Sequence, residues 1–85
     1  MPRSVFSDAY ATFIAGLVVA RKEAGVSQAE LARRIGRTQP FVSLVERRVR
    51  RLDVIEFLAV ARAIGADPAE LYGRLTERLP NEIAI

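Results

Sequence analysis

The sequence predicts an all-α fold of five helices, and three repeated helix-start signals are the main reason. Each signal pairs a side-chain acceptor with a glutamate three residues later, which is the pattern of a capping box. The three pairs are Ser27 with Glu30, Asp53 with Glu56, and Asp67 with Glu70. Apolar residues at helical spacing follow each pair, and no stretch alternates in the way that predicts a β-strand.

The predicted helices span residues 8–24, 28–35, 39–46, 54–64 and 68–79. Ser7 is the predicted N-cap of the first helix and Thr38 that of the third, whose first turn tolerates Pro40 because no intrahelical bond is lost there. The fifth begins with Pro68 and ends before Pro80. Glycine adopts the positive φ that a helix end often needs, so it ends three of the helices: Gly25, Gly36 and Gly65.

The apolar faces of these helices predict one hydrophobic core. Its expected members are Phe13, Leu17, Ala20, Leu31, Ala32, Ile35, Val42, Val45, Val54, Phe57, Val60, Ala61, Ile64, Leu71 and Leu75.

Length and composition predict a single domain, residues 1–85, and exclude several kinds of chemistry. The chain has no cysteine and no histidine, so disulfides, zinc fingers and histidine bases are excluded. The longest apolar-rich stretch, residues 13–20, is too short to span a bilayer, and no signal-peptide pattern opens the sequence. We therefore expect a cytoplasmic protein with no membrane partner, no cofactor and no small-molecule effector.

The basic residues are concentrated in one segment. The net charge is only +3, but residues 33–51 hold seven arginines and one acid, Glu46, so this window carries +6 and the other residues −3. The arginines are Arg33, Arg34, Arg37, Arg47, Arg48, Arg50 and Arg51. A basic cluster beside a pair of short helices is typical of a DNA-binding module.

Most of the chain, roughly residues 17–75, resembles the Cro/cI-type (XRE-family) helix-turn-helix regulators. The matching segments are Gly25-Val26-Ser27-Gln28, Glu30-Leu31-Ala32, Ile35-Gly36, Thr38-Gln39, Val42-Ser43, Val45-Glu46 and residues 59–64. The resemblance implies a compact five-helix lambda-repressor-like domain with its helix-turn-helix core at residues 27–47. It also implies a homodimer on a near-palindromic DNA operator, in a bacterial nucleoid-associated or phage-encoded protein.

The resemblance implies that helix 39–46 lies in the major groove, with Gln39 as the leading base reader. Gln28 would bond a phosphate and buttress Gln39. The helix face opposite Val42 and Val45 carries side chains that suit base edges or thymine methyls, although an ordinary solvated face is the alternative. The candidate base contacts are Gln39, Pro40, Ser43 and Leu44.

The candidate DNA-backbone contacts are mostly basic, and a solvated charged surface is the alternative interpretation. They are Gln28, Arg33, Arg34, Arg37, Thr38, Phe41, Arg47, Arg48, Arg50 and Arg51. Two of them depart from the family pattern. Arg48 stands where glycine is common, which predicts either a strained φ or a changed loop, and Arg37 stands where an apolar residue is common.

Arg21 and Glu46 match a family ion pair that ties the first helix to the third. The alternative for Arg21 is a surface arginine whose stem lies along apolar neighbours.

Apolar residues at both ends of the chain exceed the needs of a small core. Tyr10, Ile14 and Val18 form a stripe on the first helix. We expect helix 68–79 and the tail, residues 68–85, to form a dimer interface, although packing within the protomer is the alternative. The candidate interface residues are Tyr72, Leu75, Leu79 and Ile83.

Three functions fit these features. The first is a sequence-specific transcriptional regulator, for example a repressor, that binds double-stranded DNA. The second is an antitoxin-type autoregulator that also binds a protein partner, and the third an interaction module that has lost DNA binding. An enzyme is not expected, because no base, nucleophile or metal cluster accompanies Glu46.

Overall fold

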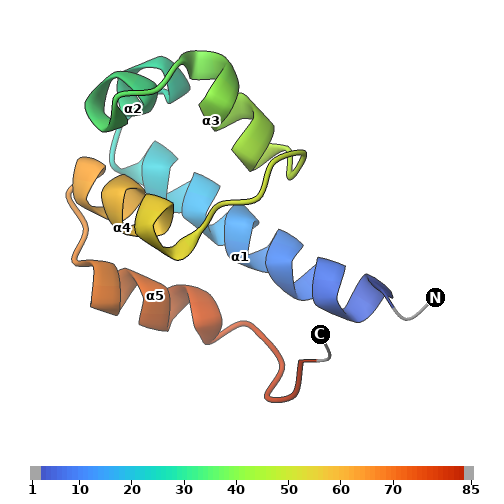
Figure 1. Ribbon diagram of the computed structural model, residues 1–85. Coiled ribbons are helices and arrows are strands. Elements are labelled where there is room, and N and C mark those ends of the chain that lie inside the picture. The colour runs from blue at the N-terminus through green and yellow to red at the C-terminus, as the bar shows by residue number, and fades with distance from the viewer. Residues whose placement is uncertain (1–2, 84–85) are drawn as a thin grey trace.

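The computed structural model describes the backbone of residues 3–83 and the side chains of residues 8–83, and these residues form five α-helices without a strand. The helices are α1 (Arg3–Glu23), α2 (Gln28–Ile35), α3 (Gln39–Glu46), α4 (Val54–Ala63) and α5 (Pro68–Thr76), as Figure 1 shows. The predicted all-α class, the number of helices and the bounds of α2 and α3 are confirmed.

The N-cap residues of the three predicted capping boxes all cap their helices, but only one of the boxes is complete. Asp53 accepts the N–H of Glu56 at 2.7 Å, and the Glu56 carboxylate accepts the N–H of Asp53 in return at 3.0 Å. Ser27 accepts the N–H of Glu30, and Asp67 accepts two N–H groups of the first turn of α5. Each cap satisfies helix-start donors that would otherwise lack partners.

Four of the predicted helix ends are wrong. α1 ends at Glu23, one residue before its predicted end. α1 begins at Arg3, so Ser7 lies inside the helix instead of capping it, and the side chain of Ser7 lies outside the described residues. α4 ends one residue early, because Ile64 is its C-cap. α5 ends at Thr76, followed by a turn in which the Leu79 N–H donates to the Thr76 carbonyl. Pro80 disfavours a helical backbone at Leu79, the residue before it, so the helix does not extend to the end that its apolar pattern predicted.

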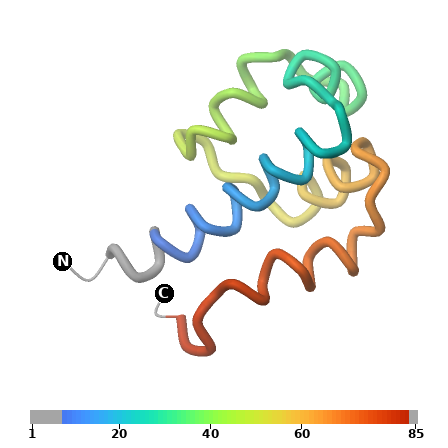
Figure 2. The backbone as a smooth tube through the Cα atoms, turned by 180° about the vertical axis from the view of Figure 1, so that it is seen from behind, coloured from blue at the N-terminus to red at the C-terminus, as the bar shows by residue number. Residues whose placement is uncertain are grey.

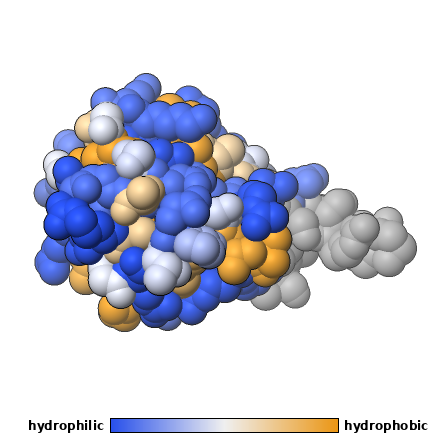
Figure 3. Space-filling model, turned by 90° about the horizontal axis from the view of Figure 1, so that it is seen from above, coloured by the Kyte–Doolittle hydropathy of each residue, from blue (hydrophilic) through white to orange (hydrophobic). Residues whose placement is uncertain are grey.

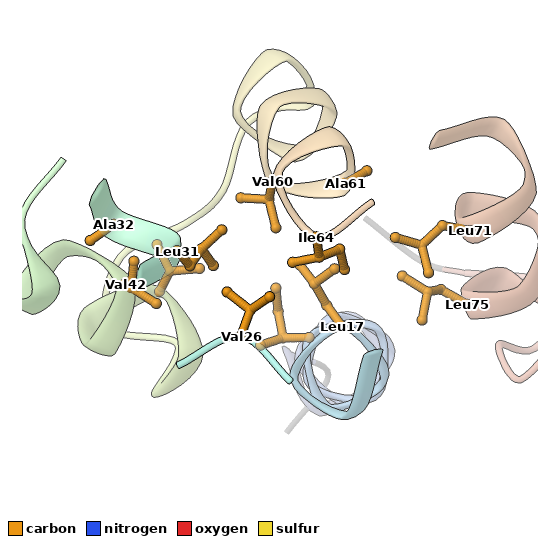
Figure 4. Close-up of a cluster of buried hydrophobic side chains, with 12 residues drawn as sticks. Leu17, Val26, Leu31, Ala32, Val42, Val60, Ala61, Ile64, Leu71 and Leu75 are labelled. Carbon is orange, nitrogen blue, oxygen red and sulfur yellow. The ribbon is translucent and has the colours of Figure 1, made fainter. Parts of the chain in front are cut away.

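All five helices contribute to one core, part of which Figure 4 shows. Val54, predicted to be buried, is 80% exposed, because Val54 and Ile55 face outward at the start of α4, whereas Glu56 and Phe57 of the same turn are partly buried. Phe13, Ala20, Ile35 and Phe57 are half-buried against the core. The buried members are Ile14, Leu17, Val26, Leu31, Ala32, Val42, Val45, Val60, Ala61, Ile64, Leu71 and Leu75.

The helices divide the molecule into two sides. α2 and α3 pack against each other, α2 packs on α4 and α3 on α1, whereas α5 packs on α1 and α4. The view from behind in Figure 2 shows α1 passing between the α2–α3 pair and α5. α1 and α5 meet closely at Gly16, where an added Cβ would lie 2.6 Å from a methyl group of Leu75. The α2–α3 pair is thus held on a scaffold that leaves its outer face uncovered.

Within the described residues, no helix is both long enough and apolar enough to cross a membrane.

Candidate nucleic-acid interface

A tight turn at Gly36 sets the angle between α2 and α3. Gly36 has φ 73°, the left-handed conformation that glycine adopts at little cost, and the N–H of Arg37 returns to the carbonyl of Ala32 at 2.9 Å. Ala32 is 2% exposed, and its small side chain lets the two helices approach each other closely. The turn and the small side chain together produce a helix-turn-helix.

The outward face of α3 presents the candidate base readers to different degrees. Gln39 and Pro40 are exposed in the first turn, whereas Ser43 and Leu44 are half-buried. The opposite face buries Val42 and Val45, as predicted. Seen from the side of α2 and α3, the surface is largely hydrophilic (Figure 3).

The predicted ion pair between Arg21 and Glu46 is present and nearly buried. Arg21 Nε lies 2.6 Å from Glu46 Oε2, and Arg21 Nη2 donates to Glu46 Oε1 at 2.9 Å. The side chains are 7% and 14% exposed, respectively. Arg21 Nη1 also donates to the carbonyl of Val26 at 2.8 Å, so the buried guanidinium is well supplied with acceptors. This two-bond pair fixes α3 to α1.

The ion pair extends into a relay that reaches Gln39. Gln28 Nε2 donates to Glu46 Oε1 at 2.8 Å, and Gln39 Nε2 donates to Gln28 Oε1 at 2.7 Å. Because a carboxylate only accepts, Gln28 must turn its amino group toward Glu46 and its oxygen toward Gln39. Gln39 then uses one N–H for Gln28, which leaves its oxygen and its other N–H for an outside partner. The expected buttressing of Gln39 by Gln28 is therefore present.

Acids from outside the basic window neutralise part of it, which the sequence interpretation missed. Glu30 pairs with both Arg33 and Arg34, and the hydrogen bonds, first from Arg33 and then from Arg34, lower the pKa of Glu30 to about 2. Arg34 also donates to the Ala63 carbonyl at 2.8 Å and so ties α2 to α4. Because Glu30 neutralises part of their charge, Arg33 and Arg34 together offer DNA less than two positive charges.

Arg37 and Arg50 share a second acid and an aromatic ring. Both pair with Glu56 of α4. Their guanidinium carbons lie 4.4 Å and 4.7 Å from the centre of the Phe41 ring, within cation–π range. Phe41, a candidate backbone contact, is half-buried beside these two arginines.

The remaining candidates lie at the two ends of α3 and in the loop that follows it. Arg47 donates to the Ser43 hydroxyl at 3.2 Å. Arg48 is exposed with φ 62°, so the loop keeps the left-handed turn and accepts a strain of roughly 1–2 kcal/mol instead of changing its path. Arg51 stacks on the Tyr10 ring at 4.7 Å. Thr38 is exposed at the N-cap position of α3, where its side chain makes no capping bond.

The surplus apolar residues at the two ends of the chain fall into two groups. Ile14 and Leu75 are 1% and 7% exposed and belong to the protomer core, so they provide no outer surface. Tyr72 and Ile83 are 54% and 38% exposed, and Leu79 is half-buried. The exposed group borders an apolar groove of about 470 Å³ between α1, α4 and α5.

The fold and this face define a helix-turn-helix protein, and the comparisons agree. The family model described as Helix-turn-helix matches residues 19–71. A solved structure, an XRE-family like protein from Pseudomonas syringae pv. tomato str. DC3000, is 44% identical with a TM-score of 0.83, covering 92% of this chain and 95% of that chain. A search of curated proteins gives no match. The chain belongs to the XRE-type helix-turn-helix family of DNA-binding regulators.

Proposed function

We propose that this protein is a sequence-specific transcriptional regulator of the cytoplasm that binds a near-palindromic DNA operator as a homodimer. The relay that ends at Gln39 is the observation that carries the proposal. It leaves an acceptor and a donor of Gln39 side by side, and this pair matches N6 and N7 of adenine in the major groove. A glutamine that only faced solvent would not need to be oriented, through Gln28, by a buried ion pair.

The outward face of α3 supplies the other proposed base contacts, Pro40, Ser43 and Leu44. The DNA backbone on either side would be held by contacts that position the protein without reading sequence. These are Gln28, Arg33, Arg34, Arg37, Thr38, Phe41, Arg47, Arg48, Arg50 and Arg51.

Replacing Arg47 with glutamine should weaken binding about equally on all DNA sequences. Each lost phosphate contact removes about one released counterion, so the slope of log K against log salt should shrink by about one. Titration of labelled duplexes at several salt concentrations measures this slope. Arg74 is exposed on α5, on another face of the molecule. Arg74→Gln removes the same charge there and should leave the slope unchanged. Equal slopes for both variants and the wild type would show that Arg47 does not bind phosphate.

The proposed dimer interface lies at the C-terminal end of the chain. This position leaves α2 and α3 free to bind DNA. Tyr72, Leu79 and Ile83 border the apolar groove and would be covered by the second protomer. Residues 84–85 of the proposed segment lie outside the described residues. A two-fold axis would place two copies of α3 about 34 Å apart, which matches half-sites separated by one turn of DNA.

The wild-type protein should sediment as a dimer at micromolar concentration, and Ile83→Glu should shift it toward monomer, because a carboxylate would be buried without a partner. Val19→Glu is the matched control, since Val19 is exposed on α1 outside this groove. A monomeric wild type that binds single half-sites without cooperativity would show that the C-terminal apolar residues serve only the protomer.

A further inference from the structure

We propose that Glu56 is an electrostatic restraint that holds Arg37 and Arg50 away from DNA until phosphate oxygens displace it. Glu56 lies on α4, outside the helix-turn-helix, and nothing in the basic segment itself identifies it. The proposal rests on the DNA-binding function above and assigns a residue that sets how strongly the protein binds DNA of any sequence.

One carboxylate joins two separate parts of the basic surface. Glu56 Oε1 accepts from Arg50 at 2.7 Å, and Glu56 Oε2 lies 3.5 Å from Arg37. Arg37 belongs to the turn between α2 and α3, whereas Arg50 belongs to the loop after α3. The Glu56 side chain is only 16% exposed, and the two arginines are 47% and 41% exposed. The acid is therefore the shielded member of the group and the arginines are its outer members.

Phe41 provides the second half of the restraint. A guanidinium can stack its face on an aromatic ring and still bond an acceptor through its edge. Arg37 and Arg50 both lie over the Phe41 ring while they bond Glu56. The two cations are thus gathered on one ring beside one anion, although they would repel each other without it.

The Glu56 carboxylate cannot move with the arginines toward DNA, because it is also hydrogen-bonded to the backbone. The same Oε1 that bonds Arg50 accepts the N–H of Asp53, which starts α4. The Arg50 hydrogen bond, followed by this backbone bond, lowers the pKa of Glu56, so the group is ionised at neutral pH. Phosphate and carboxylate compete for the same N–H groups of a guanidinium. A phosphate that binds these same N–H groups would therefore break the pairs, and the charge of Glu56 cancels about one of the two cations.

The test compares two glutamates that occupy the same position in Asp-capped helices, Glu56 in α4 and Glu70 in α5. Glu56→Gln keeps an oxygen that can accept the Asp53 N–H, so the cap is retained while the charge is lost. Glu70→Gln changes the net charge equally on a helix that packs on neither α2 nor α3. The probe is a mixed-sequence 20-base-pair duplex, titrated at several salt concentrations.

Glu56→Gln should make the salt slope steeper by about one and bind the mixed-sequence duplex roughly five- to tenfold more tightly at 0.1 M salt. Glu70→Gln should resemble the wild type. Arg50→Gln should weaken binding more in the Glu56→Gln background than in the wild type, because only there is Arg50 fully available. In the wild type, the ¹³C carboxyl shift of Glu56 should change when the duplex is added.

Two failures are distinguishable. A wild-type chain that does not bind the duplex at low salt would overturn the DNA-binding function itself. A wild type that binds, with Glu56→Gln equal to Glu70→Gln in slope and affinity, would overturn the restraint and leave Glu56 as a helix cap. An unchanged carboxyl shift, or weaker binding by Glu56→Gln, would also contradict the restraint.

Discussion

Glu46→Ala is expected to lower the free energy of unfolding by about 3–5 kcal/mol, because it leaves the nearly buried Arg21 guanidinium without its carboxylate. The same change removes the acceptor that orients Gln28. Stability and DNA binding should therefore fall together. Under conditions where the variant is still folded, its affinity for a cognate duplex should remain below that of the wild type.

Chemical denaturation of the two single variants and the Arg21→Ala/Glu46→Ala double variant gives the coupling energy of the pair. Glu30→Ala is a suitable control, since it removes a carboxylate that also pairs with arginine but is 33% exposed, and its effect on stability should be much smaller. A coupling energy near zero would contradict the claim that this pair fixes α3 to α1.

Gln39→Ala is expected to cost roughly 1–3 kcal/mol of binding energy on the cognate site and to relax the preference at one base pair in each half-site. Gln39 is exposed and bonded to Gln28 only through its amide, so its removal should leave the fold unchanged. The salt slope should also stay the same, in contrast to the effect of Arg47→Gln.

The comparison is made by selecting duplexes from a randomised pool with the wild type and with Gln39→Ala. An adenine should be enriched at one position by the wild type and lost by the variant. Thr38→Ala, the neighbouring exposed residue, should retain the adenine preference. If the variant selects the same bases as the wild type, Gln39 is not a base reader.

Much of the fold was predictable because its signals are local. Caps at Ser27, Asp53 and Asp67 and the left-handed turn at Gly36 depend on residues a few positions apart, and all four form. The errors lie at residues whose structure or burial depends on tertiary packing, which the local sequence does not show. Val54 has the spacing of a core residue, but its side chain is left exposed at the start of α4.

The candidate site was predictable only in part. The Arg21–Glu46 pair followed from the family resemblance, since a separation of 25 residues carries no local signal. The capping pattern placed Glu56 at the start of α4, yet its bonds to Arg37 and Arg50 depend on how α4 approaches the α2–α3 turn. A count of charges within the basic window therefore overstated the free charge.

The most direct test of the central claim is selection of duplex DNA from a fully randomised pool by the wild-type protein at 0.15 M salt. Sequence-specific reading by a dimer predicts convergence on a near-palindrome whose half-sites are about one helical turn apart and contain an adenine that Gln39 contacts. Recovery of an unenriched pool, by a protein that still binds DNA with a steep salt dependence, would show that the arginines bind phosphate and that α3 reads no sequence.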